Sequence, residues 1–386
     1  MTYIVWWESC ITEHQIYTLA ELSKRTDVNV TVFSTSLENA ARKKQGWNEC
    51  DWSLIQMKLI SSSAISFIVS ALKEKKNAVH IFGGPFDSWT ITLALFLSIA
   101  LGKRTYVLTE PYSTTTNGLL INRSGFKNWM LHKFRPLKFW LLWTLLRTKV
   151  EGVFAISTTA IDQLLSFGVR KEKILPFAYF VPSTHVVQNS VASKSENDST
   201  VDDLRLLFVG TLNHTKGIDL AVNAVNNLRN EHIPITLDVF GPFENLDDYD
   251  WTPHVRYQGV IPSGEVQSTM VGYDFLILPS RYDGWGVVVN EALLAGIPVI
   301  CSDRVGASTL ILKWGCGACY RGATEMALQE CLLDIHYNKT IKKSSFKNGI
   351  VQVQKVITPE YGAQYIYNCV QVRQHNGTDS PNNWYS

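Results

Sequence analysis

Residues 279–303, PSRYDGWGVVVNEALLAGIPVICSD, constrain the fold more than any other part of this chain. An apolar strand at 275–278 runs into a loop with two glycines, and the short apolar helix that follows is ended by Gly296 and Pro298. A second apolar strand begins at 299–300. A strand, a helix and a second strand in this order predict a parallel βαβ unit, and hence an α/β fold.

The same segment carries polar groups that suit a phosphorylated ligand. Asp283 in the loop and Glu291 on the helix stand eight positions apart. The glycines between them allow a close approach of the backbone, and the N–H groups at a helix start favour phosphate. Two carboxylates can bind hydroxyl groups, so the chemistry suits a sugar nucleotide. The candidate residues are Asp283, Gly284, Trp285, Gly286, Val287 and Glu291.

The chain is long enough for two domains. Its 386 residues exceed the ~250–300 at which one hydrophobic core stops growing. The stretch VVQNSVASKSENDSTVDD is polar and rich in Ser, Asn and Asp, as is typical of a linker. The predicted divisions are a first domain over 1–185, the linker over 186–203, a second domain over 204–357 and a tail over 375–386.

Composition limits the classes of partner and the compartment. A net charge of +2 provides no global attraction for nucleic acid. The start, MTYIVWWESC, has no basic region of the kind that opens a signal peptide. The apolar run 89–101 is shorter than the ~20 residues that span a bilayer. Seven scattered cysteines indicate a reducing compartment, so we expect a cytoplasmic protein.

Two short motifs resemble metal-binding motifs, but their sequence context does not favour a metal site. Cys316 and Cys319 form a CxxC without a second pair at zinc spacing, so we interpret it as a structural turn. Asp248-Tyr249-Asp250 lies in a polar loop and is interpreted as surface. We therefore expect no metal ion and no other cofactor.

Short apolar segments alternate with helical patterns through both halves, which predicts two parallel sheets. The expected strands are 3–7, 28–33, 78–82, 105–108, 153–156 and 174–177 in the first half, and 204–209, 236–240, 255–257, 275–278 and 299–300 in the second. The expected helices are 14–25, 88–101, 126–148, 158–167, 217–230 and the short helix after Gly286.

A second candidate loop follows the strand at 204–209. Gly210 ends this strand, and Lys216 stands just before the next helix, where a lysine can meet a diphosphate as a point charge. Taken alone, this motif favours a solvated loop lysine at Lys216, and the pairing with Asp283 and Glu291 in one parallel-sheet domain reverses that preference. Ligands of open α/β sheets bind outside the carboxyl ends of the strands, and Lys216, Asp283 and Glu291 all stand there.

Residues 204–312 resemble the donor-binding half of a retaining glycosyltransferase of the GT-B class, family 4. The matching segments are VGTLNHTKG, DFLILPSRYDGWGVVVNEALLAGIPVICSD and VGAS. The family's acid–x7–acid motif appears as Asp283 and Glu291, with Asp at a position that is more often Glu. The resemblance implies that Asp283 contacts donor-sugar hydroxyls and that Glu291 holds the ribose. It also implies two Rossmann-like domains facing across a cleft, with a helix at 358–374 crossing back to the first.

The first loop departs from the family pattern. Relatives usually carry an Arg near its glycine that shares the diphosphate with the lysine, and none stands between Gly210 and Lys216. Diphosphate binding is therefore expected to rest on Lys216, on loop N–H groups and on Thr211 or Thr215. Arg281, just before the acidic loop, is the candidate for a second cation.

The first half resembles the family less closely, and its candidate residues keep two interpretations each. His14 follows the first strand and could contact phosphate or acceptor, or face solvent at a helix start. Gly83 and Gly84 stand at a cleft edge or form a plain turn. Glu110 ends a strand where many relatives carry a histidine near the reacting carbon, so it is a catalytic candidate or a structural cap.

Residues 123–149 combine basic and aromatic side chains with almost no acid. This composition suits an anionic membrane surface, and it equally suits a core helix with a solvated basic edge. No nucleic-acid recognition motif accompanies it. Because members of the family that the chain resembles often use lipid-linked acceptors, we expect membrane contact here, peripheral and on the inner face. The residues concerned are Arg123, Lys127, Lys133, Arg135, Lys138, Arg147 and Lys149, with Phe126, Trp129, Phe134, Phe139, Trp140 and Trp143.

The sequence predicts an enzyme that moves a hexose from a nucleotide-sugar donor to a saccharide or lipid-linked acceptor, with retention of configuration and in cell-surface polysaccharide or glycolipid assembly. The expected catalytic residues are Lys216, Asp283 and Glu110. Two alternatives stay open: an enzyme of the same architecture that forms no glycoside, such as a sugar-nucleotide epimerase or a phosphorylase, and a non-catalytic saccharide-binding scaffold.

Overall fold

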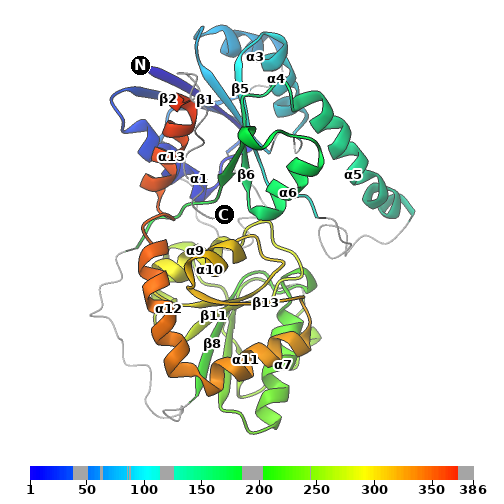
Figure 1. Cartoon of the computed structure of the whole chain (residues 1–386), viewed down its shortest axis with the longest axis vertical. Helices are drawn as coiled ribbons and strands as arrows, with labels where there is room; N and C mark the ends of the chain where they lie inside the picture. Colours follow the sequence, from blue (N-terminus) through cyan, green and yellow to red (C-terminus); the bar gives the residue numbers. More distant parts are fainter. Residues whose placement is uncertain are drawn as a thin grey trace.

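A computed structural model describes residues 1–37, 51–60, 64–84, 86, 88–113, 126–184, 203–243 and 245–372. Two parallel sheets stand one above the other in Figure 1, each flanked by helices, and they form two Rossmann-like domains. The GT-B architecture expected from the sequence is therefore confirmed. The expected linker falls outside the described residues except for Asp203, and the expected tail lies outside them entirely.

The first sheet has seven parallel strands in the order β3-β2-β1-β4-β5-β6-β7. Its central strands are buried on both faces, because helices cover each side, and apart from His80 in β4 they consist of apolar residues and glycine. The strands are β1 (Thr2–Cys10), β2 (Val28–Ser36), β3 (Met57–Leu59), β4 (Val79–Gly83), β5 (Arg104–Thr109), β6 (Gly152–Ile156) and β7 (Ile174–Phe177).

Helices of the first domain connect these strands. They are α1 (Glu13–Ser23), α3 (Ala64–Lys73), α4 (Trp89–Ala100), α5 (Phe126–Leu146) and α6 (Thr158–Ser166). Helix α1 begins directly after β1, and the side-chain oxygen of Gln15 accepts the Thr12 N–H at 3.0 Å to close its first turn. This hydrogen bond fixes the start of α1 at the carboxyl edge of the sheet.

The second sheet has six parallel strands in the order β10-β9-β8-β11-β12-β13. The strands are β8 (Leu204–Val209), β9 (Ile235–Phe240), β10 (Val255–Tyr257), β11 (Phe275–Leu278), β12 (Val299–Ser302) and β13 (Gly317–Tyr320). The helices of this domain are α7 (Ile218–Asn230), α8 (Val266–Met270), α9 (Val287–Leu294), α10 (Ser308–Trp314), α11 (Glu325–Tyr337) and α12 (Lys339–Val353). Helices α9 and α10 lie between this sheet and the first domain (Figure 1).

The chain then returns to the first domain as α13 (Pro359–Val372), which lies beside α1 in Figure 1. The Tyr367 hydroxyl donates to Asp27, and the guanidinium of Arg25 stacks 3.7 Å from the centre of the Tyr367 ring. The Gln371 amide donates to Thr2 at 2.6 Å. These contacts attach the last described helix to the sheet that begins the chain.

Some elements differ from the expectations. The sequence patterns did not predict the following elements: β3, α3, α8, α10, α11, α12 and β13. The interpretation of the CxxC as a turn is wrong, since Cys316 leads directly into β13 and Cys319 lies within it, paired in register with Cys301 of β12. In the described part of the chain, no helix has the length and apolar character needed to cross a membrane.

Candidate active site

A cavity of about 420 Å³ lies between the two domains, where strands of both sheets end. Its size is in the range of small-molecule sites, ~300–1,000 Å³. Loops after β1, β5, β7, β8, β9 and β11 contribute to it, so both domains form its wall. Its charged and aromatic lining residues are Glu13, His14, Tyr17, Glu110, Tyr179, Lys216, Asp283, Trp285 and Glu291.

Lys216 enters the cavity from a short helical turn after β8. The Asn213 side chain accepts the Lys216 N–H at 2.9 Å and caps this turn. Gly217 follows at φ +70°, and a Cβ there would stand 2.1 Å from the Pro279 carbonyl oxygen. The Lys216 ammonium lies 2.5 Å from a carboxylate oxygen of Asp283. Two candidate residues that are far apart in the sequence are therefore one ion pair.

Arg281 is placed outside the lining of this cavity. Its guanidinium makes a two-pronged contact with the Asp219 carboxylate of α7, at 2.7 and 2.6 Å, and also donates to the carbonyl of His214. The Arg281 side chain is 13% exposed. Arg281 thus holds the turn that carries Lys216, instead of presenting a second cation to a ligand. Thr215 has the same supporting position, because its carbonyl accepts the Arg281 N–H at 2.8 Å.

The acidic loop is fixed on both sides. Asp283 accepts at its backbone oxygen from the Gly306 N–H and donates its own N–H to the Arg304 carbonyl. Gly286, at φ +89°, allows the chain to turn into α9. The Trp285 indole is buried and donates to Asn290 at 2.8 Å, and Asn290 donates to the Tyr179 carbonyl of the first domain at 2.9 Å. This chain of bonds ties the loop across the domain boundary.

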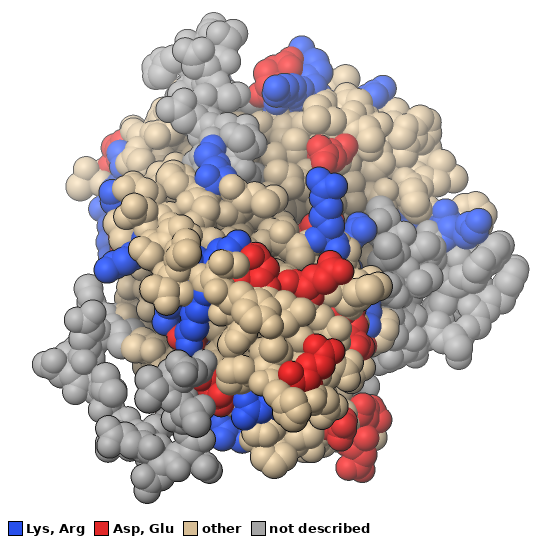
Figure 2. All heavy atoms as spheres, turned by 60° about the horizontal axis from the view of Figure 1, so that its bottom comes forward, with Lys and Arg blue, Asp and Glu red and all other residues tan. Residues whose placement is uncertain are grey.

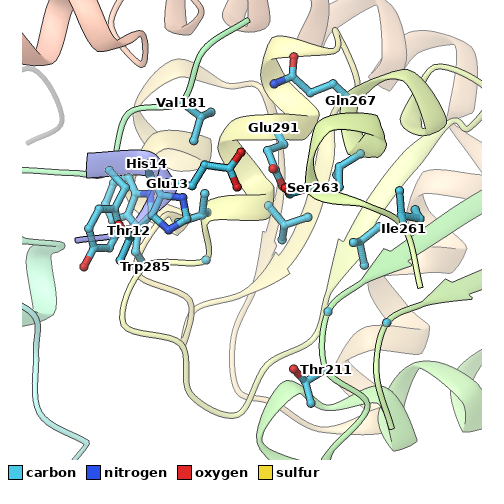
Figure 3. Close-up of a pocket in the computed structure, with 18 of the residues that line it drawn as sticks. Thr12, Glu13, His14, Val181, Thr211, Ile261, Ser263, Gln267, Trp285 and Glu291 are labelled. Carbon is cyan, nitrogen blue, oxygen red and sulfur yellow. The ribbon is translucent and has the colours of Figure 1, made fainter. Parts of the chain in front are cut away.

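Glu291 lines the cavity and faces an acid that the sequence did not predict. Burial and the nearby Glu13 carboxylate raise the pKa of Glu291 to about 8. Burial also raises the pKa of Glu13, against the effect of a hydrogen bond with Ser263. Figure 3 shows the side chains of Glu13 and Glu291 pointing toward one another from α1 and α9. One acid of each domain therefore meets in the cavity.

Glu110 lies beside the acidic loop. The Tyr179 hydroxyl donates to its carboxylate. A Cβ on Gly284 would stand 2.7 Å from a Glu110 carboxylate oxygen, so the absence of a side chain at Gly284 leaves the space that Glu110 occupies. The Tyr179 ring also lies 5.3 Å from that of His14, which lines the cavity and is buried. The structure thus brings Glu110 and His14 together with the second-domain acids.

The remaining candidates divide between the lining and its surroundings. Gly210, Thr211, Gly286 and Val287 line the cavity, and Gly83 and Gly84 do not. Gly83 packs against the Glu8 carboxylate, since a Cβ there would stand 1.7 Å from its oxygen. The loops after β7 and β9 also line the cavity, and their position after strand ends is the sequence signal that could have identified them.

Charge within the cavity is mostly negative. Glu13, Glu110, Asp283 and Glu291 line it, with Lys216 as the cation among the described lining residues. The described residues contain no group of three or more His, Cys, Asp or Glu side chains arranged to hold a metal ion. On the face shown in Figure 2, acidic and basic side chains are interspersed and form no extended basic surface.

Residues 192–348 match the model of the family described as "Glycosyl transferases group 1". Among curated proteins, the chain is 26% identical over 144 residues to an uncharacterized glycosyltransferase, MJ1178, of Methanocaldococcus jannaschii, covering 37% of this chain and 41% of that protein. It is 29% identical over 115 residues to glycogen synthase of Mycobacterium tuberculosis, covering 28% of each. The chain thus spans less than half the length of these relatives.

The fold has close counterparts among solved structures. The structure of Anabaena Alr3699/HepE in complex with UDP superposes with a TM-score of 0.68 at 13% identity, covering 96% of this chain and 100% of that chain. The same protein in complex with UDP-glucose gives a TM-score of 0.66. At this identity the likeness concerns the fold, and the sequence match concerns the second domain. Residues 192–348 of this GT-B chain, which make up most of the second domain, are thus similar to the glycosyl transferases group 1 family.

Proposed function

We propose that this protein transfers a hexose from a nucleotide-sugar donor to a saccharide or lipid-linked acceptor, with retention of anomeric configuration. One observation carries the proposal: Lys216, Asp283 and Glu291, from three segments of the second domain, meet in one cavity that the first domain closes. A nucleotide sugar offers a diphosphate to the lysine and hydroxyls to the carboxylates. The complexes of the HepE structure with UDP and UDP-glucose support this donor class.

In the proposed reaction, the bond between the sugar C1 and the diphosphate oxygen breaks, and a bond from C1 to the acceptor oxygen forms on the same face. The proton of the acceptor hydroxyl passes to the departing phosphate oxygen. Lys216 stabilises the charge that develops on the diphosphate, an effect that is large in a water-poor site. Asp283 holds Lys216 in place and accepts hydrogen bonds from the donor sugar.

In this scheme, Glu110 contacts the acceptor. It comes from the first domain, lies against Gly284 of the acidic loop and is oriented by the Tyr179 hydroxyl. A carboxylate there can accept a hydrogen bond from the incoming hydroxyl and so align it with C1. His14, adjacent to Tyr179, lines the same side of the cavity.

The proposal contains no metal ion and no other cofactor, as we expect from the sequence. Lys216 and the N–H groups at the start of α9 supply the positive charge. Turnover that is unchanged by EDTA supports this part of the proposal. Turnover that EDTA abolishes and Mg²⁺ or Mn²⁺ restores would contradict it.

We also propose that α5 contacts an anionic membrane surface, which would bring the site to a lipid-linked acceptor. Its buried face anchors it through Trp143 and Leu146. Its other face exposes Phe134, Leu137, Trp140, Leu141 and Leu145, with exposed Lys133 and Lys138 beside them. Arg123 lies outside the described residues, as do the side chains of Phe126, Lys127 and Trp129. In Figure 1, α5 lies at the outer edge of the first domain.

The donor can be identified with purified protein and a panel of UDP-, GDP- and ADP-sugars. A ligand that binds the folded state raises the melting temperature, so the true donor should stand out from the panel. The donor so found is then incubated with saccharide and lipid-linked acceptors, and NMR of the product gives the anomeric configuration. Product with the donor's configuration supports the proposal, and inverted product contradicts retention.

The same measurements separate the alternatives. Release of the nucleotide with slow hydrolysis of the sugar indicates a catalyst, and an altered sugar that stays on the nucleotide indicates an epimerase. Binding without any turnover across the acceptors indicates a saccharide-binding scaffold. A protein that no nucleotide sugar stabilises would overturn the donor assignment.

A further inference from the structure

Glu13 is the feature of the cavity that the proposed function leaves unexplained. It is in the first turn of α1, in the first domain, yet it forms a hydrogen bond with Ser263 of the second domain. It lines the cavity opposite Glu291 (Figure 3). The other titratable or charged groups of the lining are His14, Tyr17, Glu110, Tyr179, Lys216 and Asp283.

Two carboxylates that face one another in a partly buried site cannot both be charged without a large cost. The nearest cation in the lining, Lys216, is already paired with Asp283 at 2.5 Å. Of the second-domain elements around Glu291, α8 contributes the uncharged Gln267 to the cavity, and α12 places Gln354 against carbonyls of α9. The pair therefore retains a proton, with Glu291 as the principal holder.

A ligand with two adjacent hydroxyl groups resolves this conflict. Each hydroxyl can donate to one carboxylate, so both acids accept a hydrogen bond and neither needs the shared proton. The ribose of the nucleotide donor carries such a 2′,3′-diol, and the family resemblance places the ribose at Glu291.

We propose that Glu13 is a second ribose-binding carboxylate, supplied by the first domain, so that the nucleotide's diol bridges Glu13 and Glu291 and fastens the two domains together. This inference rests on the proposed nucleotide-sugar donor. Binding of the nucleotide then releases the proton that the two acids share, and the affinity rises as the pH approaches 8. The second domain alone gives an incomplete nucleotide site.

Calorimetry with the full chain tests this assignment. The probe is whichever of UDP, GDP and ADP binds the wild-type protein most tightly, compared with its 2′,3′-dideoxy analogue. Glu13→Gln should weaken binding of the ribonucleotide roughly 10- to 100-fold, since a hydrogen bond to a charged acceptor is lost. The affinity for the dideoxy analogue should fall by less than about threefold, because this analogue has no 2′- or 3′-hydroxyl that could bond to Glu13. Glu21→Gln, on the same helix but outside the cavity lining, is the matched control and should bind both nucleotides as the wild type does.

Proton release is measured with the wild-type protein, so it does not depend on how a variant folds. Titrations at pH 7.5 in phosphate and in Tris should give enthalpies that differ more for the ribonucleotide than for the dideoxy analogue. The phosphates of both probes ionise alike, so the difference reports the diol.

If Glu13→Gln weakens the affinity for the ribonucleotide and for its dideoxy analogue by the same factor, or changes neither, the assignment is overturned while the donor class stays in place. Equal proton release with the two probes would overturn it as well. If none of the three nucleotides binds the wild-type protein, the proposed function falls together with this inference.

Discussion

The ammonium of Lys216 and the carboxylate of Asp283 lie 2.5 Å apart, although 67 positions separate them in the chain. The Lys216 side chain is 30% exposed and that of Asp283 only 11%. The pair therefore joins the loop after β8 to the loop after β11 at the edge of the cavity. Each residue orients the other, and a donor sugar and its diphosphate would meet both together.

Lys216→Ala should reduce turnover by roughly 10²–10³-fold, the usual cost of removing one preorganised donor to a developing charge. The loss should appear in kcat as well as in donor affinity, because the charge on the diphosphate grows in the transition state. Steady-state kinetics measure both, and circular dichroism checks folding. A well-folded Lys216→Ala enzyme with the wild-type kcat would remove Lys216 from the reaction.

Arg281→Ala should act through structure. Its guanidinium holds Asp219 and the His214 carbonyl, so its loss should lower the free energy of unfolding by about 1–3 kcal/mol. Asp219→Ala breaks the same contact and should have a similar effect. The double variant should lower the free energy of unfolding by less than the sum of the two single variants. Denaturant titrations of the three variants give the coupling. Arg281→Ala with unchanged stability and strongly weakened diphosphate binding would instead make Arg281 a ligand contact.

Much of the fold could be predicted because many of its strands are marked locally. The strands over 204–209, 255–257 and 275–278 have the expected bounds, since they are followed by Gly, a polar residue and Pro. The strand over 174–177 also has the expected bounds. The edge strand β3 has three residues and is largely exposed, so it has no apolar pattern to detect. Helix α12, KTIKKSSFKNGIVQV, is also weakly patterned, because tertiary packing of a few side chains holds it.

The donor side of the site was predictable, and the contacts across the cleft were not. Lys216, Asp283 and Glu291 follow strand ends of one sheet, so their meeting follows from topology. The position of Glu13 opposite Glu291, and of Glu110 against Gly284, depends on how the two domains are placed. No local pattern encodes that placement. Arg281 shows the reverse case, in which a nearby sequence position does not bring a side chain into the cavity.

The stability of the ligand-free protein should depend on pH through Glu291. Its pKa of about 8 exceeds the usual 4.5, so the folded state holds a proton that the unfolded state has released. The free energy of unfolding should therefore fall as pH rises from about 4.5 to about 8, by up to roughly 1.4 kcal/mol per unit, and level off above that. Denaturant titrations at several pH values compare the wild type with Glu291→Gln, in which this contribution is absent.

The control for this measurement is Glu265→Gln, an exposed position on the same side of the domain. Its stability curve should follow that of the wild type. If Glu291→Gln also follows the wild type between pH 5 and pH 8, Glu291 is ionised when no nucleotide is added, and the two acids share no proton.

Gly306→Ala should displace the acidic loop, because an added side chain at this position meets the backbone of the loop at Gly284. A Cβ at Gly306 would stand 2.1 Å from the Gly284 carbonyl oxygen and 2.9 Å from the Cβ of Ser157, which belongs to the first domain. The backbone must move to relieve this contact, so we expect a loss of about 1–3 kcal/mol in stability and a lower kcat. Gly272→Ala, whose added Cβ would meet no atom closer than 3.8 Å, is the matched control. Wild-type kcat in Gly306→Ala would show that the loop tolerates displacement.

The membrane proposal for α5 predicts that the protein sediments with anionic vesicles at low salt. Charge reversal of Lys133, Arg135 and Lys138 to Glu should abolish the electrostatic part of this binding, which screening also removes, since the electrostatic reach falls to ~3 Å at 1 M salt. Donor hydrolysis should be unchanged, because these residues do not line the cavity.

The exposed apolar face of α5 should contribute a share of vesicle binding that salt does not remove. Trp140 is 46% exposed and Leu141 is 51% exposed. The double variant Trp140→Ser, Leu141→Ser should therefore lose the vesicle binding that remains at high salt. Trp143 is buried and its replacement would report only on folding. Vesicles of neutral lipid separate the two contributions, because they retain the apolar share and lack the charge. A folded protein that binds neither kind of vesicle at low salt would make α5 a solvated helix and a water-soluble saccharide the acceptor to pursue.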